Sequence, residues 1–155
     1  MPRTEPADGR PPTPRPGTIR QGDRDKAYRP LPAGARRAAF EQALGAYAEG
    51  DFFEAHERLE PAWMGTDDLS ERALHQGLIK LAAAYVHAVR GNPAGTAKNL
   101  EGARRHLARA EAAARTHAVD LVDLVTALDE RLARLRAGDP DPAPHPPVIR
   151  RTAPA

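Results

Sequence analysis

The sequence predicts an all-α fold, a single antiparallel helical bundle of about five helices over residues 33–136, with proline-rich tails on both sides. Apolar side chains recur at helical spacing throughout this range, and no stretch shows the apolar–polar alternation of a half-buried strand. Of the 16 prolines, eight precede Ala33 and six follow Arg136. Because proline lacks an amide proton and has a fixed φ, we expect residues 1–32 and 137–155 to be disordered tails.

The first helix is predicted over residues 33–49, where Phe40, Leu44 and Tyr47 fall on one face and define an apolar stripe. Gly50 follows directly and is suited to the left-handed conformation that commonly ends a helix. This helix is therefore expected to bury one stripe against the rest of the bundle.

The second helix is predicted to begin at Asp51, whose carboxylate can accept the free backbone amide of Glu54 at capping-box spacing. It is expected to continue to Trp63 or Met64. Pro61 lies inside it, removes one ladder hydrogen bond and crowds the preceding turn, so we expect a kink or a tightened last turn there.

Three further helices are predicted over residues 68–90, 92–115 and 120–136. Each begins at an Asp or Asn that can cap it, and the fourth helix also has a proline at its first position, where the missing amide costs nothing. Their apolar faces comprise Leu74, Leu78, Leu81, Tyr85 and Val89, then Ala97, Leu100, Ala103, Leu107 and Ala110, then Leu121, Leu124, Leu128, Leu132 and Leu135.

The isoelectric point of 9.3 suggests a nucleic-acid partner until the charges are placed along the chain. Residues 1–32 carry seven Lys or Arg and four Asp or Glu, whereas the bundle carries 14 basic and 15 acidic side chains, a net charge of −1. The bundle therefore lacks the basic face that nucleic-acid binding requires. We expect the partner to be a small molecule or a protein, and a homo-oligomer is compatible with the sequence.

The cysteine content and the hydropathy of the sequence exclude several kinds of site and segment. The chain has no cysteine, which excludes disulfides and thiolate chemistry. No apolar run approaches the ~18 residues of a membrane span, and the amino terminus is polar and rich in proline rather than charged and then apolar. We therefore expect a cytoplasmic protein without a membrane segment.

A polar stripe runs along the predicted second helix beside its apolar face. At ~100° per residue, His56, Glu60 and Trp63 fall within about 60° of one another. Phe52 and Leu59 flank them, so the stripe is expected to border the core rather than open solvent.

The predicted third helix has a matching strip, in which Gln76, Lys80, Ala83 and His87 share one narrow face. Buried polar groups must find partners or lose hydration energy, so a repeated polar strip needs a specific explanation. If the two strips face each other, they form what we term the polar seam: His56, Glu57, Glu60, Gln76, Lys80 and His87.

Three interpretations of the polar seam remain open. In the first, the seam is structural: Glu60 pairs with Lys80, and the imidazoles bond to Gln76 or to the backbone. In the second, His56, Glu60 and His87 bind a divalent metal such as zinc, iron or manganese and leave positions open for water, as in hydrolytic sites. In the third, a His–Glu pair performs metal-free acid–base chemistry while Lys80 holds an anionic ligand.

The other histidines are expected to lie outside the polar seam. His75 is rotated off the strip of the third helix, and His106, His117 and His145 are expected to be exposed. None of the four is assigned a chemical role.

A set of motifs covers about residues 40–107, in this order: Phe40, Gly50-Asp51-Phe52-Phe53-Glu54-Ala55-His56-Glu57, Glu60, Trp63, Arg72, His75-Gln76-Gly77-Leu78-Ile79, Ala82-Ala83, His87 and Gly91-Asn92. This set resembles the pattern of an uncharacterised prokaryotic family catalogued as domain of unknown function 309. That pattern has a "Y-F-E-A-H-E-x-x-E-x-x-W" helix, then "R-x-x-L-Q-G-L-I-Q-x-A-A-A-x-x-H", then "G-N-x-x-G-A".

The resemblance implies a small helical bundle and the activity predicted for that family, metal-dependent hydrolysis. The motif positions carried over are His56, Glu57, Glu60, Trp63, Arg72, Gln76, Lys80 and His87. We predict Glu57, Glu60 and Lys80 as catalytic residues, His56, Glu60 and His87 as metal ligands, and Trp63, Arg72 and Gln76 as ligand-binding or seam residues. Lys80 departs from the Gln of many members, and Pro61 lies inside the motif. The alternative is a non-catalytic binding or scaffold module in which the polar seam fixes the register of the helices.

Overall fold

The computed structural model describes residues 18–21, 24–138 and 145–153 of the chain. Within these ranges the fold is helical, and the predicted all-α bundle is confirmed. Its helices are α1 (Ala33–Ala48), α2 (Phe52–Met64), α3 (Leu69–Val89), α4 (Pro93–Leu107), α5 (Glu111–Thr116) and α6 (Leu121–Arg136). None of the described helices combines the length and the apolar character needed to cross a membrane.

Two short strands precede the bundle. β1 (Thr18–Gln21) and β2 (Arg24–Ala27) pair antiparallel, with Thr18 opposite Ala27. They lie in a range for which the sequence predicts disorder. Strands of four residues with mostly polar sequences show no apolar alternation, which is why the pattern did not predict them.

Side-chain caps begin the helices where the sequence predicts them. Asp51 accepts the amide of Glu54 at 3.1 Å, and Asp68 accepts the amide of Glu71 at 2.8 Å. The amino ends of α4 and α6 are capped in the same way. α2 continues past Pro61 to its end at the following turn.

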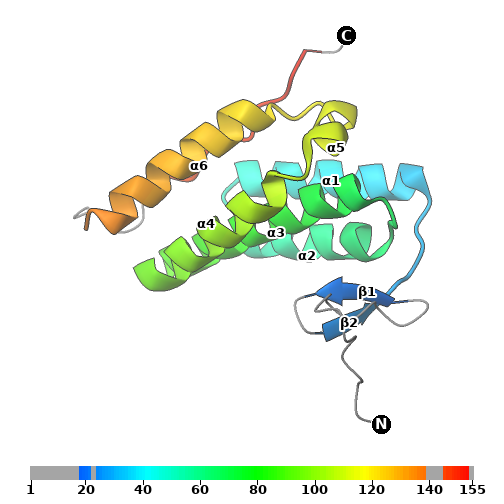
Figure 1. Cartoon of the computed structure of the whole chain (residues 1–155), viewed down its shortest axis with the longest axis horizontal. Coiled ribbons are helices and arrows are strands. Elements are labelled where there is room, and N and C mark those ends of the chain that lie inside the picture. Colours follow the sequence, from blue (N-terminus) through cyan, green and yellow to red (C-terminus); the bar gives the residue numbers. More distant parts are fainter. Residues whose placement is uncertain (1–17, 22–23, 139–144, 154–155) are drawn as a thin grey trace, which may run out of the picture.

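α3 is the central helix, because it packs against both α2 and α4 while α1 packs on α2 and α6 on α4 (Figure 1). Twelve residues of α3 are buried, which is more than a single helix face contains. Other elements therefore cover α3 on more than one side. Gly77 permits the close approach of α4, since a Cβ atom there would lie 2.7 Å from the side chain of Leu107.

The predicted fourth helix is in fact two helices, and this prediction was wrong. α4 ends at Leu107, and α5 begins again at Glu111. The amide of Ala113 at the start of α5 donates to the hydroxyl of Ser70 on α3 at 2.9 Å. This contact between distant segments supports the break, and no glycine or proline marks it in the sequence.

Residues 145–153 pack on the bundle in an extended path, although the sequence predicts a disordered tail from residue 137. The Tyr47 hydroxyl donates to the carbonyl of buried Pro147 at 2.7 Å. Both outer nitrogens of the Arg151 guanidinium donate to the Glu41 carboxylate at 2.8 Å. The folded unit therefore includes this carboxyl-terminal segment.

Candidate functional site

Three side chains of α2 bring their ligand atoms together. One atom from each of His56, Glu57 and Glu60 lies within 4.8 Å of the other two, and we call these residues the α2 group. Helical geometry explains the cluster, because residues one turn apart lie above one another and adjacent residues differ by ~100°. The side chains of His56 and Glu57 are 32% and 50% exposed, so solvent reaches the group.

One ring nitrogen of His56, Nδ1, is buried and is not used in a hydrogen bond with the described residues. This atom lies 3.4 Å from Oε1 of Glu57, which is long for a hydrogen bond. Two ligand atoms of one tetrahedral zinc ion are separated by about 3.4 Å, so the spacing fits a pair of metal ligands.

Lys80 and His87, two of the α3 members of the predicted polar seam, belong instead to the contact between α3 and α4. His87 lies at the end of α3, with its Nδ1 atom 3.2 Å from the Asn92 side-chain nitrogen. The stem of Lys80 lies beside Gly102 of α4. Burial, followed by the nearby charge of Lys80, lowers the pKa of His106. The predicted metal set, which included His87, is thus not brought together.

The remaining candidate residues are also separate from the α2 group. Trp63 and Gln76 are buried. Arg72 donates to the carbonyl of Asp67 at 3.3 Å, and its Nε atom is buried without a partner. Within the described part of the chain, no hydrogen bond or ion pair joins Lys80 or these residues to the α2 group. A helical projection shows which residues share a face, but not which neighbouring helix that face meets.

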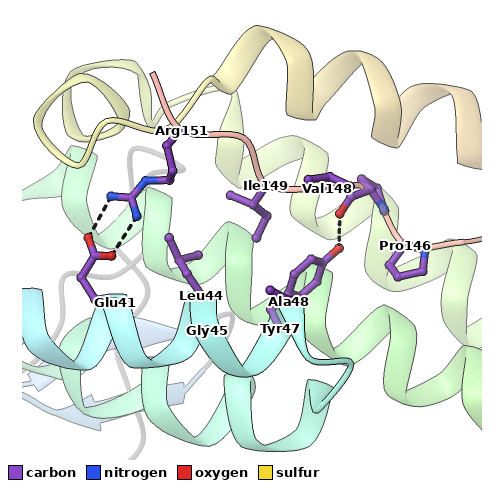
Figure 2. A pocket seen from close by; sticks show the side chains of 10 residues that line it. Glu41, Leu44, Gly45, Tyr47, Ala48, Pro146, Val148, Ile149 and Arg151 are labelled. Atoms are coloured by element: carbon purple, nitrogen blue, oxygen red, sulfur yellow. Dashed lines mark hydrogen bonds and ion pairs between the residues drawn. The ribbon is translucent and has the colours of Figure 1, made fainter. Parts of the chain in front are cut away.

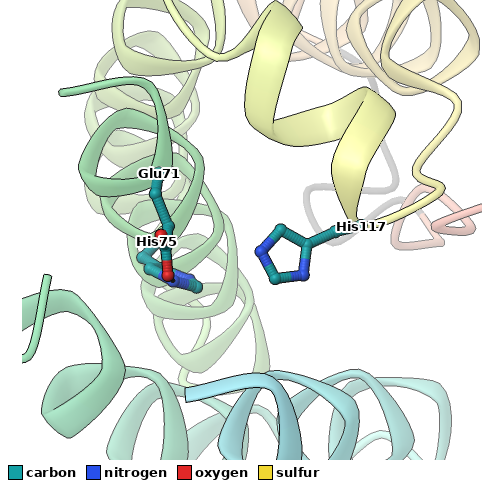
Figure 3. Close-up of side chains that lie close together, drawn as sticks. All are labelled: Glu71, His75 and His117. Carbon is teal, nitrogen blue, oxygen red and sulfur yellow. Dashed lines mark hydrogen bonds and ion pairs between the residues drawn. The ribbon is translucent and has the colours of Figure 1, made fainter. Parts of the chain in front are cut away.

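A second cluster, which the sequence analysis did not predict, is buried between α3 and the end of α5 (Figure 3). Glu71 and His75 lie one turn apart on α3, and His117 is the residue that follows α5. One ligand atom of each lies within 4.8 Å of the other two, and we call these residues the buried group.

Both histidines of the buried group are shielded from solvent, which corrects the prediction for His117. His75 is 0% exposed and His117 is 6% exposed, so the expectation that His117 is exposed was wrong. Its ring packs on Phe40 with 4.4 Å between the ring centroids. Of the other histidines predicted to be exposed, His145 is exposed and His106 is half-buried. The spacing of Glu71 and His75 offered a local signal, whereas His117 had none.

Hydrogen bonds keep the Glu71 carboxylate ionised. It lies 3.4 Å from Nε2 of His75, and it accepts from Nε of Arg36 at 2.7 Å and from the Thr66 hydroxyl at 3.1 Å. The contact with His75 first, and that with Arg36 next, lower the pKa of Glu71 to about 2. Burial lowers the pKa of His117, which favours its neutral imidazole. At neutral pH the buried group therefore has an ionised carboxylate at Glu71 and favours a neutral imidazole at His117.

A groove of about 450 Å³ separates α1 from the carboxyl-terminal segment and touches neither group (Figure 2). Leu44 and Ile149 line its middle, and the Glu41–Arg151 ion pair lies at one end. The hydrogen bonds from Arg151 lower the pKa of Glu41 and hold this ion pair together. The groove is thus apolar along its length and bounded by a paired charge.

Comparison with known proteins places the α2 group in a recognised domain. A family model described as domain of unknown function (DUF309) matches residues 40–99, a range that contains α2 and α3 but ends before His117. No curated protein and no solved structure matches the chain. Residues 40–99 are therefore similar to the family that the motifs indicated.

Proposed function

We propose that this domain binds a divalent transition-metal ion at the α2 group and performs metal-dependent hydrolysis. The observation that carries the proposal is the convergence of ligand atoms from His56, Glu57 and Glu60 within 4.8 Å, on a part of α2 that solvent reaches. One imidazole and two carboxylates form a donor set that zinc, iron and manganese accept.

The three side chains have distinct roles in this proposal. His56 contributes Nδ1, the nitrogen that has no other partner. Glu57 and Glu60 contribute one carboxylate oxygen each, and all three ligands come from one helix, which leaves the outward positions to water and substrate. A divalent ion there supplies Lewis acidity and lowers the pKa of a water molecule. The second oxygen of half-exposed Glu57 can accept the proton of that water.

The test uses the full chain purified without a polyhistidine tag, loaded with zinc, iron or manganese. Metal content and hydrolysis of nitrophenyl esters and phosphodiesters are measured for the wild type, His56→Gln and Glu60→Gln. Both variants should lose the ion of the α2 group and at least about a hundredfold in hydrolysis rate. His145→Gln is the matched control, since His145 is an exposed histidine outside both groups. Equal metal content and hydrolysis in the wild type and His56→Gln would refute the proposal.

A second candidate is the non-catalytic module, and the contacts between α3 and α4 favour it. His87 lies against the cap residue of α4, and Lys80 packs beside Gly102, so both seam residues support helix packing. In that case His87→Ala lowers the melting temperature without changing metal content, and no metal-dependent hydrolysis is found in the wild type. Hydrolysis that depends on His56 would exclude this candidate.

A further inference from the structure

We propose that the buried group, Glu71, His75 and His117, is a second metal site that binds zinc and ties α3 to the end of α5. Its residues are different from those of the α2 group, so each proposal can be tested, and refuted, independently of the other. His117 also lies outside the range that matches the family model. The proposed site therefore extends beyond the range that matches the family model.

The geometry brings two imidazoles and a carboxylate from separate segments to one place. Figure 3 shows one ring nitrogen of His117 facing His75 and Glu71. The three ligand atoms lie within 4.8 Å of one another, and Nε2 of His75 is 3.4 Å from Oε1 of Glu71. That hydrogen-bond distance also equals the separation of about 3.4 Å between two ligands of a tetrahedral zinc ion.

The ring nitrogens of His75 and His117 need partners that the protein does not supply. Of the four, only Nε2 of His75 has a hydrogen-bond partner among the described residues, and the Nδ1 atoms of both rings are buried without one. Buried polar atoms without partners are rare, and each calls for a specific explanation such as a bound ion. A metal ion bound by His117 would use a ring nitrogen that has no partner, and at Nε2 of His75 it would replace the 3.4 Å contact with Glu71.

The chemistry of the donor set suits zinc as well. The hydrogen bond from Arg36 orients the Glu71 carboxylate, as a neighbour of a metal ligand commonly does. Imidazole donors favour zinc over magnesium or calcium.

Because both histidine ligands are buried, a substrate has little access to an ion there, and we assign the site a structural role. The carbonyl of His117 accepts from Nη2 of Arg151 at 2.6 Å. An ion that holds His117 therefore also holds the point where residues 145–153 dock. Zinc is expected to raise the melting temperature and to slow tryptic cleavage after Arg150 and Arg151.

The experiment titrates zinc alone into the full chain, free of a polyhistidine tag and stripped with a chelator. Stoichiometry is measured by calorimetry and melting temperature by circular dichroism. His56→Gln removes the α2 group, and it should still bind one zinc ion and gain thermal stability. His117→Gln should lose at least about tenfold in the zinc affinity of the buried group. His106→Gln is the matched control, because His106 is half-buried and outside both groups.

The outcomes separate the two sites. If His56→Gln binds no zinc while the wild type binds one ion, only the α2 group exists and this inference is overturned. If His56→Gln binds one ion and the double variant with His117→Gln binds none, the buried site is established. Should His117→Gln fail to fold, cobalt-loaded His56→Gln must show the visible absorption of a tetrahedral site. If cobalt-loaded His56→Gln lacks this visible absorption, the inference is overturned.

Discussion

Replacing Glu71 with glutamine should destabilise the metal-free protein in a pH-dependent way. The carboxylate is 14% exposed and is held by Arg36, Thr66 and His75. Lowering its pKa from the ordinary 4.5 to about 2 corresponds to about 3 kcal/mol of stability at neutral pH, since each pH unit is worth ~1.36 kcal/mol. Glu71→Gln should lose up to that amount, because the amide keeps the shape of the side chain but not its charge.

The direction of the pH dependence follows from the lowered pKa. Below its ordinary pKa, the unfolded chain binds a proton at Glu71 that the native protein does not, so acid favours unfolding. The contribution is complete above about pH 5, declines as the pH falls towards 2, and is absent below that. The wild type should therefore lose its advantage over Glu71→Gln across this range.

The assay is urea unfolding of both proteins, in the presence of a chelator, between about pH 7 and pH 2. Glu111→Gln serves as control, because Glu111 is an exposed glutamate whose pairing with Arg115 should contribute little. A loss below about 1 kcal/mol at neutral pH, or a difference that does not change with pH, would contradict the reasoning.

Three further substitutions test the packing by thermal or urea unfolding. Tyr47→Phe leaves the buried carbonyl of Pro147 unpaired and should cost about 1–2 kcal/mol, and an unchanged midpoint would mean that this hydrogen bond is not a net stabiliser. Gly77→Ala places a Cβ atom 2.7 Å from the Leu107 side chain and should cost about 1–3 kcal/mol, unless α4 moves away freely. Gly50→Ala meets no neighbour but has a φ of +82°, so it should cost about 1 kcal/mol from the backbone alone. A neutral result there would show that the turn relaxes.

The helices that the sequence predicts correctly have their causes close by in the chain. Asp51 and Asp68 cap amides three residues ahead, and Gly50 adopts the positive φ that ends a helix. The α2 group also has a local cause, although the predicted metal set had His87 in place of Glu57. His56, Glu57 and Glu60 all lie on one helix, so its period alone brings them together.

The wrong predictions have distant causes. The break between α4 and α5 is supported by a hydrogen bond to Ser70, and the order of residues 145–153 depends on Tyr47 and Glu41 of α1. Composition predicted disorder for that segment because it contains prolines, yet a proline carbonyl is still a good acceptor for a buried donor. The sequence carries no local sign of where that donor lies.

Local sequence determined the helical class, the caps and the α2 group, because helical periodicity and capping act within one or two turns. Tertiary structure alone decided which faces meet: it placed Lys80 and His87 against α4 and brought His117 to Glu71 and His75. The physical reason is that side chains from separate elements meet only when the whole core packs, and no spacing along the chain encodes that packing.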